Sequence, residues 1–190
     1  MIDPKRIRYA VEKGIYLAQT GRPGPCWLDI PLNVQGATVE TDELEGFDPA
    51  KENLTAIPSV TNEQADAIIE KIRQAKRPVL NAGNGIRIAG AFDVFRRVVD
   101  KLGIPVVTGW NSIDLMEDEH PLYTGRAGNM GDRAGNFAVQ NSDLLFSAGS
   151  RLSIRQVNYD WPAWAKHAFV IMNDIDAEEL KKPSLHVEMP

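Results

Sequence analysis

From Thr61 onward, strand-like and helix-like apolar patterns alternate, and this alternation limits the folds open to the chain. A helical stripe from Ala65 to Ala75 precedes a short strand at 79–82, with Gly83 and Gly85 directly after it. A second helical stripe over 88–102 precedes a strand at 104–108. Strands that alternate with helices of this length are typical of a parallel sheet. The sequence therefore predicts an α/β domain over 61–190.

The same alternation continues to the last residue of the sequence. Asp132 is placed to cap a short helix over 132–141, and strands are expected at 143–148, 168–172 and 185–188. Glycine, aspartate and asparagine are frequent over 109–131, so we expect a long loop there. Thr61 and Gln64 have the spacing of a capping box, which would start the first helix of the domain.

The first 60 residues follow a different pattern. Asp3 and Pro4 indicate a helix start, and the helix is expected to end near Gly21. A short strand is expected at 26–31, in which Cys26 would be packed. Residues 32–60 contain turn formers and acids with little periodicity, so we interpret them as an interdomain linker. One helix and one strand cannot bury a core, so residues 1–31 need another partner.

Composition excludes several classes of protein. The 190 residues carry a formal net charge of −5 and a pI near 5.3, which argues against a nucleic-acid partner. The single Cys excludes an internal disulfide framework and favours a reducing compartment, the cytoplasm. No apolar run approaches the ~18–20 residues that span a bilayer, so no membrane association is expected.

In a parallel sheet, ligands bind beyond the carboxyl ends of the strands. Here those ends are followed by glycine, arginine and aspartate. Such residues suit a nucleotide, because glycine lets backbone N–H groups approach phosphate, arginine pairs with its charge and a carboxylate accepts ribose hydroxyls. The dinucleotide fingerprint G-x-G-x-x-G is incomplete, since Ile88 stands at its third glycine. The alternative is a tight strand-to-helix turn without a ligand. The three His and Cys26 have no metal-site spacing, so no metal ligands are predicted.

Four motifs in the sequence carry a family resemblance. Residues 21–31 read G-R-P-G-P-C-W-L-D-I-P, residues 128–131 form a G-x-x-G loop followed by 136–145, and the other two motifs are residues 149–151 with Arg155 and residues 174–180. Together they resemble motifs of thiamine diphosphate-dependent enzymes of the acetolactate synthase type. Only Cys26 departs from the family run G-R-P-G-P-V-W-L-D-I-P, and residues 136–145 are similar to the family's A-V-Q-N-A-D-L-L.

The resemblance implies a domain assignment. Residues 1–31 would be the last helix and strand of the pyrimidine-binding domain, 32–60 a linker, and 61–190 the central domain. The family's central domain is a Rossmann-like parallel sheet of six strands flanked by helices, and in some members it binds FAD or ADP. The positions that match a nucleotide-binding cleft are Gly83, Gly85, Gly128, Gly131, Arg151, Arg155 and Asp174.

The resemblance also implies a function for a longer parent enzyme. That parent would use thiamine diphosphate and Mg²⁺ to decarboxylate a 2-keto acid such as pyruvate and to join the product to a second carbonyl. The family's catalytic Glu and its G-D-G…N motif have no counterpart in these 190 residues, so we predict no catalytic residues and no activity for the chain alone. Its expected partners are the remaining domains of the parent and further copies in a homo-oligomer.

Two other interpretations remain open at this point. Ser153 and Ile154 stand where the family often has the acids of R-F-D-D-R, which suits a related 2-keto acid decarboxylase or lyase of a sugar pathway. The second alternative is a stand-alone, non-enzymatic nucleotide-binding module. That module would explain the glycines of the predicted cleft but not the helix and strand at 1–31.

Overall fold

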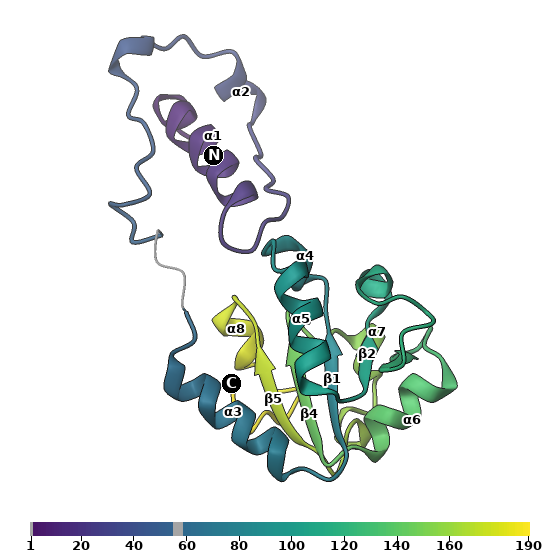
Figure 1. The fold of residues 1–190 in the computed structure, drawn as a ribbon. Helices are drawn as coiled ribbons and strands as arrows, with labels where there is room; N and C mark the ends of the chain where they lie inside the picture. The colour runs from purple at the N-terminus through teal and green to yellow at the C-terminus, as the bar shows by residue number, and fades with distance from the viewer. Residues whose placement is uncertain (1, 55–58) are drawn as a thin grey trace. The chain divides into compact units, whose positions relative to one another are not determined.

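The computed structural model of the chain describes residues 2–54 and 59–190, and it divides into two compact units (Figure 1). Unit 1 is Met1–Ser59 and unit 2 is Val60–Pro190. Among the residues described, no helix combines the length and apolar character needed to cross a membrane.

Unit 1 is built around one amphipathic helix. Asp3 caps the 3₁₀ turn that leads into this helix, because its side chain accepts a hydrogen bond from the Lys5 N–H. The elements of unit 1 are the 3₁₀ helices η1 (Pro4–Arg6) and η2 (Thr41–Glu43) and the helices α1 (Ile7–Gln19) and α2 (Leu32–Gln35).

The segment that follows α2 returns to pack against α1. The Phe47 ring lies 5.4 Å from the Tyr16 ring between centroids, and the Phe47 N–H donates to the Glu12 carboxylate at 2.7 Å. Glu52 accepts hydrogen bonds from Tyr9 and Lys13 of α1. These contacts order residues 44–54 within unit 1, while the assignment of unit 1 to a pyrimidine-binding domain stays a prediction.

The strand expected at 26–31 is wrong for the residues that the structure describes. The segment is without strand pairing, Trp27 is 92% exposed, and Cys26 is exposed where we expected a packed thiol. A strand needs a hydrogen-bonded neighbour, and the apolar pattern of this segment says nothing of whether one is present.

Unit 2 holds a sheet of five parallel strands in the order β3-β2-β1-β4-β5. This order starts at the middle of the sheet and runs outward in both directions, as in Rossmann-like folds. The strands are β1 (Pro78–Ala82), β2 (Val106–Thr108), β3 (Tyr123–Arg126), β4 (Leu144–Ala148) and β5 (Phe169–Asn173). The helices are α3 (Asn62–Gln74), α4 (Gly85–Ile88), α5 (Phe92–Leu102), η3 (Trp110–Leu115), α6 (Arg133–Asn141), α7 (Ile154–Val157), η4 (Trp161–Ala163) and α8 (Ala177–Leu180).

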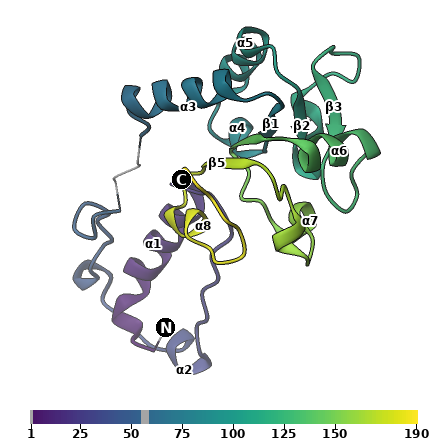
Figure 2. The same cartoon turned by 90° about the horizontal axis from the view of Figure 1, so that it is seen from below.

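Helices lie on both faces of this sheet (Figure 2), and an apolar cluster packs on each face. Leu80 and Val106 belong to a cluster with Ile72 of α3 and Val99 of α5. Alternate residues of the same strands pack on the other face with α6 and residues 164–168. Because successive strand residues point to opposite faces, the apolar runs of the strands supply both layers.

The α/β class with a parallel sheet is confirmed, but the count of six strands is corrected to five. Residues 185–188 form no strand, although Ile171 and Met189 make an isolated parallel bridge. The structure has one strand that was not predicted, β3, which lies inside the loop expected over 109–131. Its sequence, Tyr-Thr-Gly-Arg, has no apolar alternation, because an edge strand is only half-buried.

Of three helix features predicted from the sequence, one is confirmed and two differ in the structure. Thr61 and Gln64 form the predicted capping box, with both reciprocal hydrogen bonds. The stripe over 88–102 is two helices rather than one, because Gly90 adopts a φ of +66° between α4 and α5. Asp132 precedes α6, but its side chain makes no capping hydrogen bond.

Candidate functional site

All seven predicted binding residues follow strands whose carboxyl ends lie at the same edge of the sheet. Gly83 and Gly85 follow β1, Gly128 and Gly131 follow β3, Arg151 and Arg155 follow β4, and Asp174 follows β5. The strands are parallel, so the topology brings these residues to one edge. We call this region, residues 83–85, 128–131, 149–158 and 174–182, the carboxyl edge.

The glycines after β1 are in tight contact with the backbone after β4. A Cβ on Gly83 would lie 2.3 Å from the carbonyl oxygen of Gly149, and a Cβ on Gly85 would lie 2.7 Å from the same oxygen. The Gly85 N–H donates to that oxygen at 2.8 Å. Close packing of the two loops thus accounts for both glycines, and their role toward a phosphate stays a prediction.

The glycines after β3 are also in backbone contact. Gly128 has a φ of +119°, and a Cβ there would lie 2.6 Å from the carbonyl oxygen of Arg155. The Asn129 N–H donates to this oxygen at 2.9 Å. A Cβ on Gly131 would lie 2.6 Å from the Arg126 carbonyl oxygen. The loop after β3 is therefore packed against the backbone of α7.

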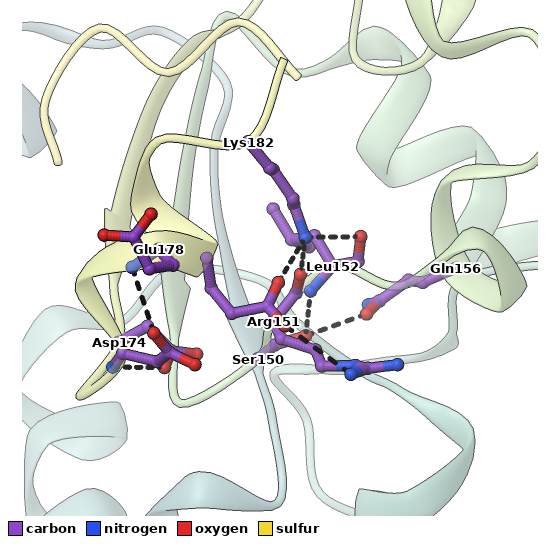
Figure 3. Close-up of polar contacts among 9 residues, drawn as sticks. Ser150, Arg151, Leu152, Gln156, Asp174, Glu178 and Lys182 are labelled. Carbon is purple, nitrogen blue, oxygen red and sulfur yellow. Dashed lines mark hydrogen bonds and ion pairs between the residues drawn. The ribbon is translucent and has the colours of Figure 1, made fainter. Parts of the chain in front are cut away.

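Charged residues of the carboxyl edge make polar contacts with the loop after β4 (Figure 3). The Arg151 side chain is 54% exposed, and its guanidinium lies 3.5 Å from the Glu179 carboxylate. The Lys182 ammonium donates to the Arg151 and Leu152 carbonyl oxygens and to Glu179. Asp174 is half-buried and accepts a hydrogen bond from the Asp176 N–H at 3.0 Å. The α8 region is thus tied to the loop after β4.

Four polar side chains outside the seven predicted site residues join this loop to the sheet. Asn81 and Ser147 are buried in β1 and β4, and the Asn81 amide donates to the Ser147 hydroxyl at 2.9 Å. Gln156 of α7 donates to the Asn81 carbonyl oxygen at 2.6 Å and accepts from the Ser150 hydroxyl at 2.9 Å. The signal in the sequence was an asparagine within an otherwise apolar strand.

An ion pair joins the end of edge strand β3 to the start of α6. The Arg126 guanidinium donates to both carboxylate oxygens of Asp132, at 2.8 and 3.0 Å, and the Arg126 N–H donates as well. These hydrogen bonds lower the pKa of Asp132 to about 2. The pair closes the turn between β3 and α6, which explains why Asp132, at the N-cap position of α6, makes no side-chain capping hydrogen bond.

A small pocket of mixed polarity lies between α5 and η3 and shares no lining residue with the carboxyl edge. It is lined by residues that include Phe92, Arg96, Asp100 and His120. Within the described ranges, the structure contains no group of three or more His, Cys, Asp or Glu side chains placed to hold a metal ion.

An all-parallel sheet in this strand order, with glycine-rich and charged loops at its carboxyl edge, defines a Rossmann-like α/β domain. The sequence matches the family "Thiamine pyrophosphate enzyme, central domain" over residues 65–189. The chain therefore belongs to the thiamine pyrophosphate (thiamine diphosphate) enzymes, and the resemblance of its motifs to that family is confirmed.

Similar proteins are large subunits of acetolactate synthases. The chain is 36% identical to the "Acetolactate synthase large subunit" of Lactococcus lactis over 90% of the chain and 29% of the relative. It is 37% identical to that of Corynebacterium glutamicum, over 99% of the chain and 29% of the relative. It is 34% identical to a probable large subunit of Methanococcus aeolicus, over 98% of the chain and 30% of the relative. The chain thus spans about 30% of the length of these relatives.

Proposed function

We propose that unit 2 serves as the central domain of an acetolactate synthase-like enzyme. The observation that carries this proposal is the family match over 65–189, combined with 34–37% identity to three acetolactate synthase subunits across nearly the whole chain. The proposed whole enzyme decarboxylates a 2-keto acid such as pyruvate and joins the product to a second carbonyl. Thiamine diphosphate supplies the carbanion chemistry of such enzymes.

We place the thiamine diphosphate and Mg²⁺ sites outside these 190 residues. The G-D-G…N motif of the family does not occur in the sequence, and the described residues hold no carboxylate cluster for a divalent ion. In this proposal the chain has a structural role and takes no direct part in the reaction. It belongs to a homo-oligomer that also contains the remaining domains of the enzyme, located in the cytoplasm. The test is acetolactate formation from pyruvate by the whole enzyme that contains this chain, supplied with thiamine diphosphate and Mg²⁺. Absence of product would contradict the proposal.

At the carboxyl edge we propose a nucleotide, FAD or ADP. The exposed Arg151 and Arg155 would pair with its phosphates, and Asp174 would accept ribose hydroxyls. Gly83, Gly85, Gly128 and Gly131 would contribute by holding the loops in place, since their own Cβ space is filled by backbone. The support is that the topology places arginines and a carboxylate at one edge, where ligands of such sheets bind.

Titration of the chain with FAD and with ADP, followed by tryptophan fluorescence, tests this second proposal. We expect saturation with one of them and an affinity about 10-fold weaker or more in R151A or R155A, because each loses a charged hydrogen bond. R97A is the matched control, since exposed Arg97 lies on α5 and not in the carboxyl-edge loops. No saturable change with either nucleotide would contradict the proposal.

One observation favours a second candidate for the whole enzyme. Ser153 and Ile154 occupy the positions of the two acids in the family run R-F-D-D-R, which changes the charge of the loop between the two arginines. A related decarboxylase or lyase acting on another 2-keto acid is consistent with this difference. Assaying carbon dioxide release from a panel of 2-keto acids separates the two candidates.

A further inference from the structure

A chain of polar side chains runs from the centre of the sheet to the surface loop that carries Arg151 and Arg155. It begins at Ser147 of β4, passes through Asn81 of β1 and Gln156 of α7, and ends at Ser150. Asn81 and Ser147 are each fully buried. Because buried polar groups need partners, this series of hydrogen-bonded side chains has few alternative arrangements.

Gln156 is the member of the chain that joins the loop to the sheet. Its amide nitrogen donates to Asn81 Oδ1 at 2.6 Å, and its amide oxygen accepts from Ser150 Oγ at 2.9 Å. Both ends of one side chain are thus engaged, by a strand on one side and by the loop after β4 on the other. Loss of the Gln156 side chain would leave the buried Asn81 oxygen without its donor.

The opposite side of α7 is held by the loop after β3. The Asn129 N–H donates to the Arg155 carbonyl oxygen, and Gly128 approaches that oxygen without a side chain of its own. Leu152 and Val157 pack with Met172 of β5 in a small apolar cluster. The backbone around Arg155 is therefore held by the loop after β3 and by the apolar cluster with β5, and Gln156 adds a hydrogen bond to the central strand β1.

We propose that Gln156 is a positioning residue for the carboxyl edge. Its two amide hydrogen bonds fix α7 against β1 and the loop after β4, and so determine where Arg151 and Arg155 present their charges. This inference rests on the proposed nucleotide binding for its functional consequence. The structural part, that Gln156 holds α7 in place, does not depend on any ligand.

Hydrogen–deuterium exchange of the full chain tests the structural part. The N–H groups of Gln156, Val157 and Asn158 are hydrogen-bonded within α7 and its start. In Q156A we expect these amides to exchange about 5- to 100-fold faster, the range that corresponds to loss of a buried hydrogen bond. Q156E keeps the length and the acceptor for Ser150 but loses the donor to Asn81, so it should show the same local change where Q156A fails to fold.

Q140A is the matched control for these variants. Gln140 of α6 accepts a hydrogen bond from the Ala165 N–H at 3.1 Å, so its loss removes a glutamine contact that does not hold α7. Exchange over 153–158 should stay unchanged in Q140A. Equal exchange over 153–158 in wild type, Q156A, Q156E and Q140A would overturn the proposal.

The functional part is read from nucleotide affinity. With the nucleotide that saturates wild type, we expect about 10-fold weaker binding in Q156A and no change in Q140A. Q156E should bind the nucleotide as weakly as Q156A at neutral pH, because an ionised carboxylate cannot donate to Asn81. Wild-type affinity in Q156E would overturn the role of the Asn81 hydrogen bond. If wild type binds neither nucleotide, the proposed nucleotide function fails, and the exchange measurement alone decides the role of Gln156.

Discussion

Replacing Gly83 by alanine should force apart the two loops that meet beyond β1 and β4. The added Cβ would lie 2.3 Å from the Gly149 carbonyl oxygen and 2.5 Å from the Ser150 Cα. Ordinary contact begins near 3.4 Å, so the two backbones must separate by about 1 Å. Neither atom belongs to a flexible side chain that could move aside.

The energetic cost follows from this displacement. Overpacking of a tight site costs about 1–3 kcal/mol. The hydrogen bond from Gly85 N–H to the Gly149 oxygen, now 2.8 Å long, would stretch beyond hydrogen-bonding range, which costs about 0.5–1.5 kcal/mol more. We therefore expect G83A to lower the free energy of unfolding of unit 2 by about 2–4 kcal/mol.

Gly109 offers a matched control in the same unit. It follows β2 with a φ of −83°, and a Cβ there would meet nothing closer than 3.5 Å. G109A should therefore change stability by less than about 1 kcal/mol. Urea unfolding of both variants, followed by circular dichroism, measures the difference. Stabilities of G83A and G109A within 1 kcal/mol of each other would refute the close packing described for these loops.

Three further predictions concern other parts of the molecule. The pKa of Asp132, about 2, lies below its unfolded value of 3.8, so the pair with Arg126 stabilises the fold above pH 3.8, and this stabilisation is lost as the pH falls through 2. The D132N variant should remove this pH dependence, which is measured by comparing the stability of variant and wild type during acid titration. Its cost in stability should be below about 1 kcal/mol, because the pair is partly exposed. G103A should destabilise unit 2 by about 1 kcal/mol in thermal unfolding, since Gly103 ends α5 at a φ of +61°, and an unchanged melting temperature would contradict this. The isolated chain with thiamine diphosphate and Mg²⁺ should release no carbon dioxide from pyruvate, and turnover above a denatured control would refute that expectation.

The sequence was sufficient for the parts of the fold that depend on local pattern. The helical stripe of α3, its capping box at Thr61 and Gln64, and the apolar strands β1 and β4 were all predictable, because each is written in residue spacing. Edge strand β3 was not, since a half-buried strand needs no apolar alternation. The strand expected at 26–31 had the right residues and lacked a described pairing partner, which no local pattern can reveal.

The candidate site likewise has features that the sequence could predict and features that depend on distant parts of the chain. Gly83 was identified from its position after a strand and Gly128 from its match to the family's G-x-x-G loop, but their tight backbone contacts come from loops 66 and 27 residues away, at Gly149 and Arg155. Gln156 was missed because one glutamine in a loop carries no pattern. Its importance arises from Asn81, which lies 75 residues earlier in the chain.

The most direct test of the central claim is to map where the nucleotide binds. Hydrogen exchange of the chain should be compared with and without saturating FAD, and with and without saturating ADP. We expect slower exchange at the carboxyl edge, over 83–85, 128–131, 149–158 and 174–182, and unchanged exchange at the opposite ends of the strands. Protection confined to other segments, or no protection with either nucleotide, would contradict it.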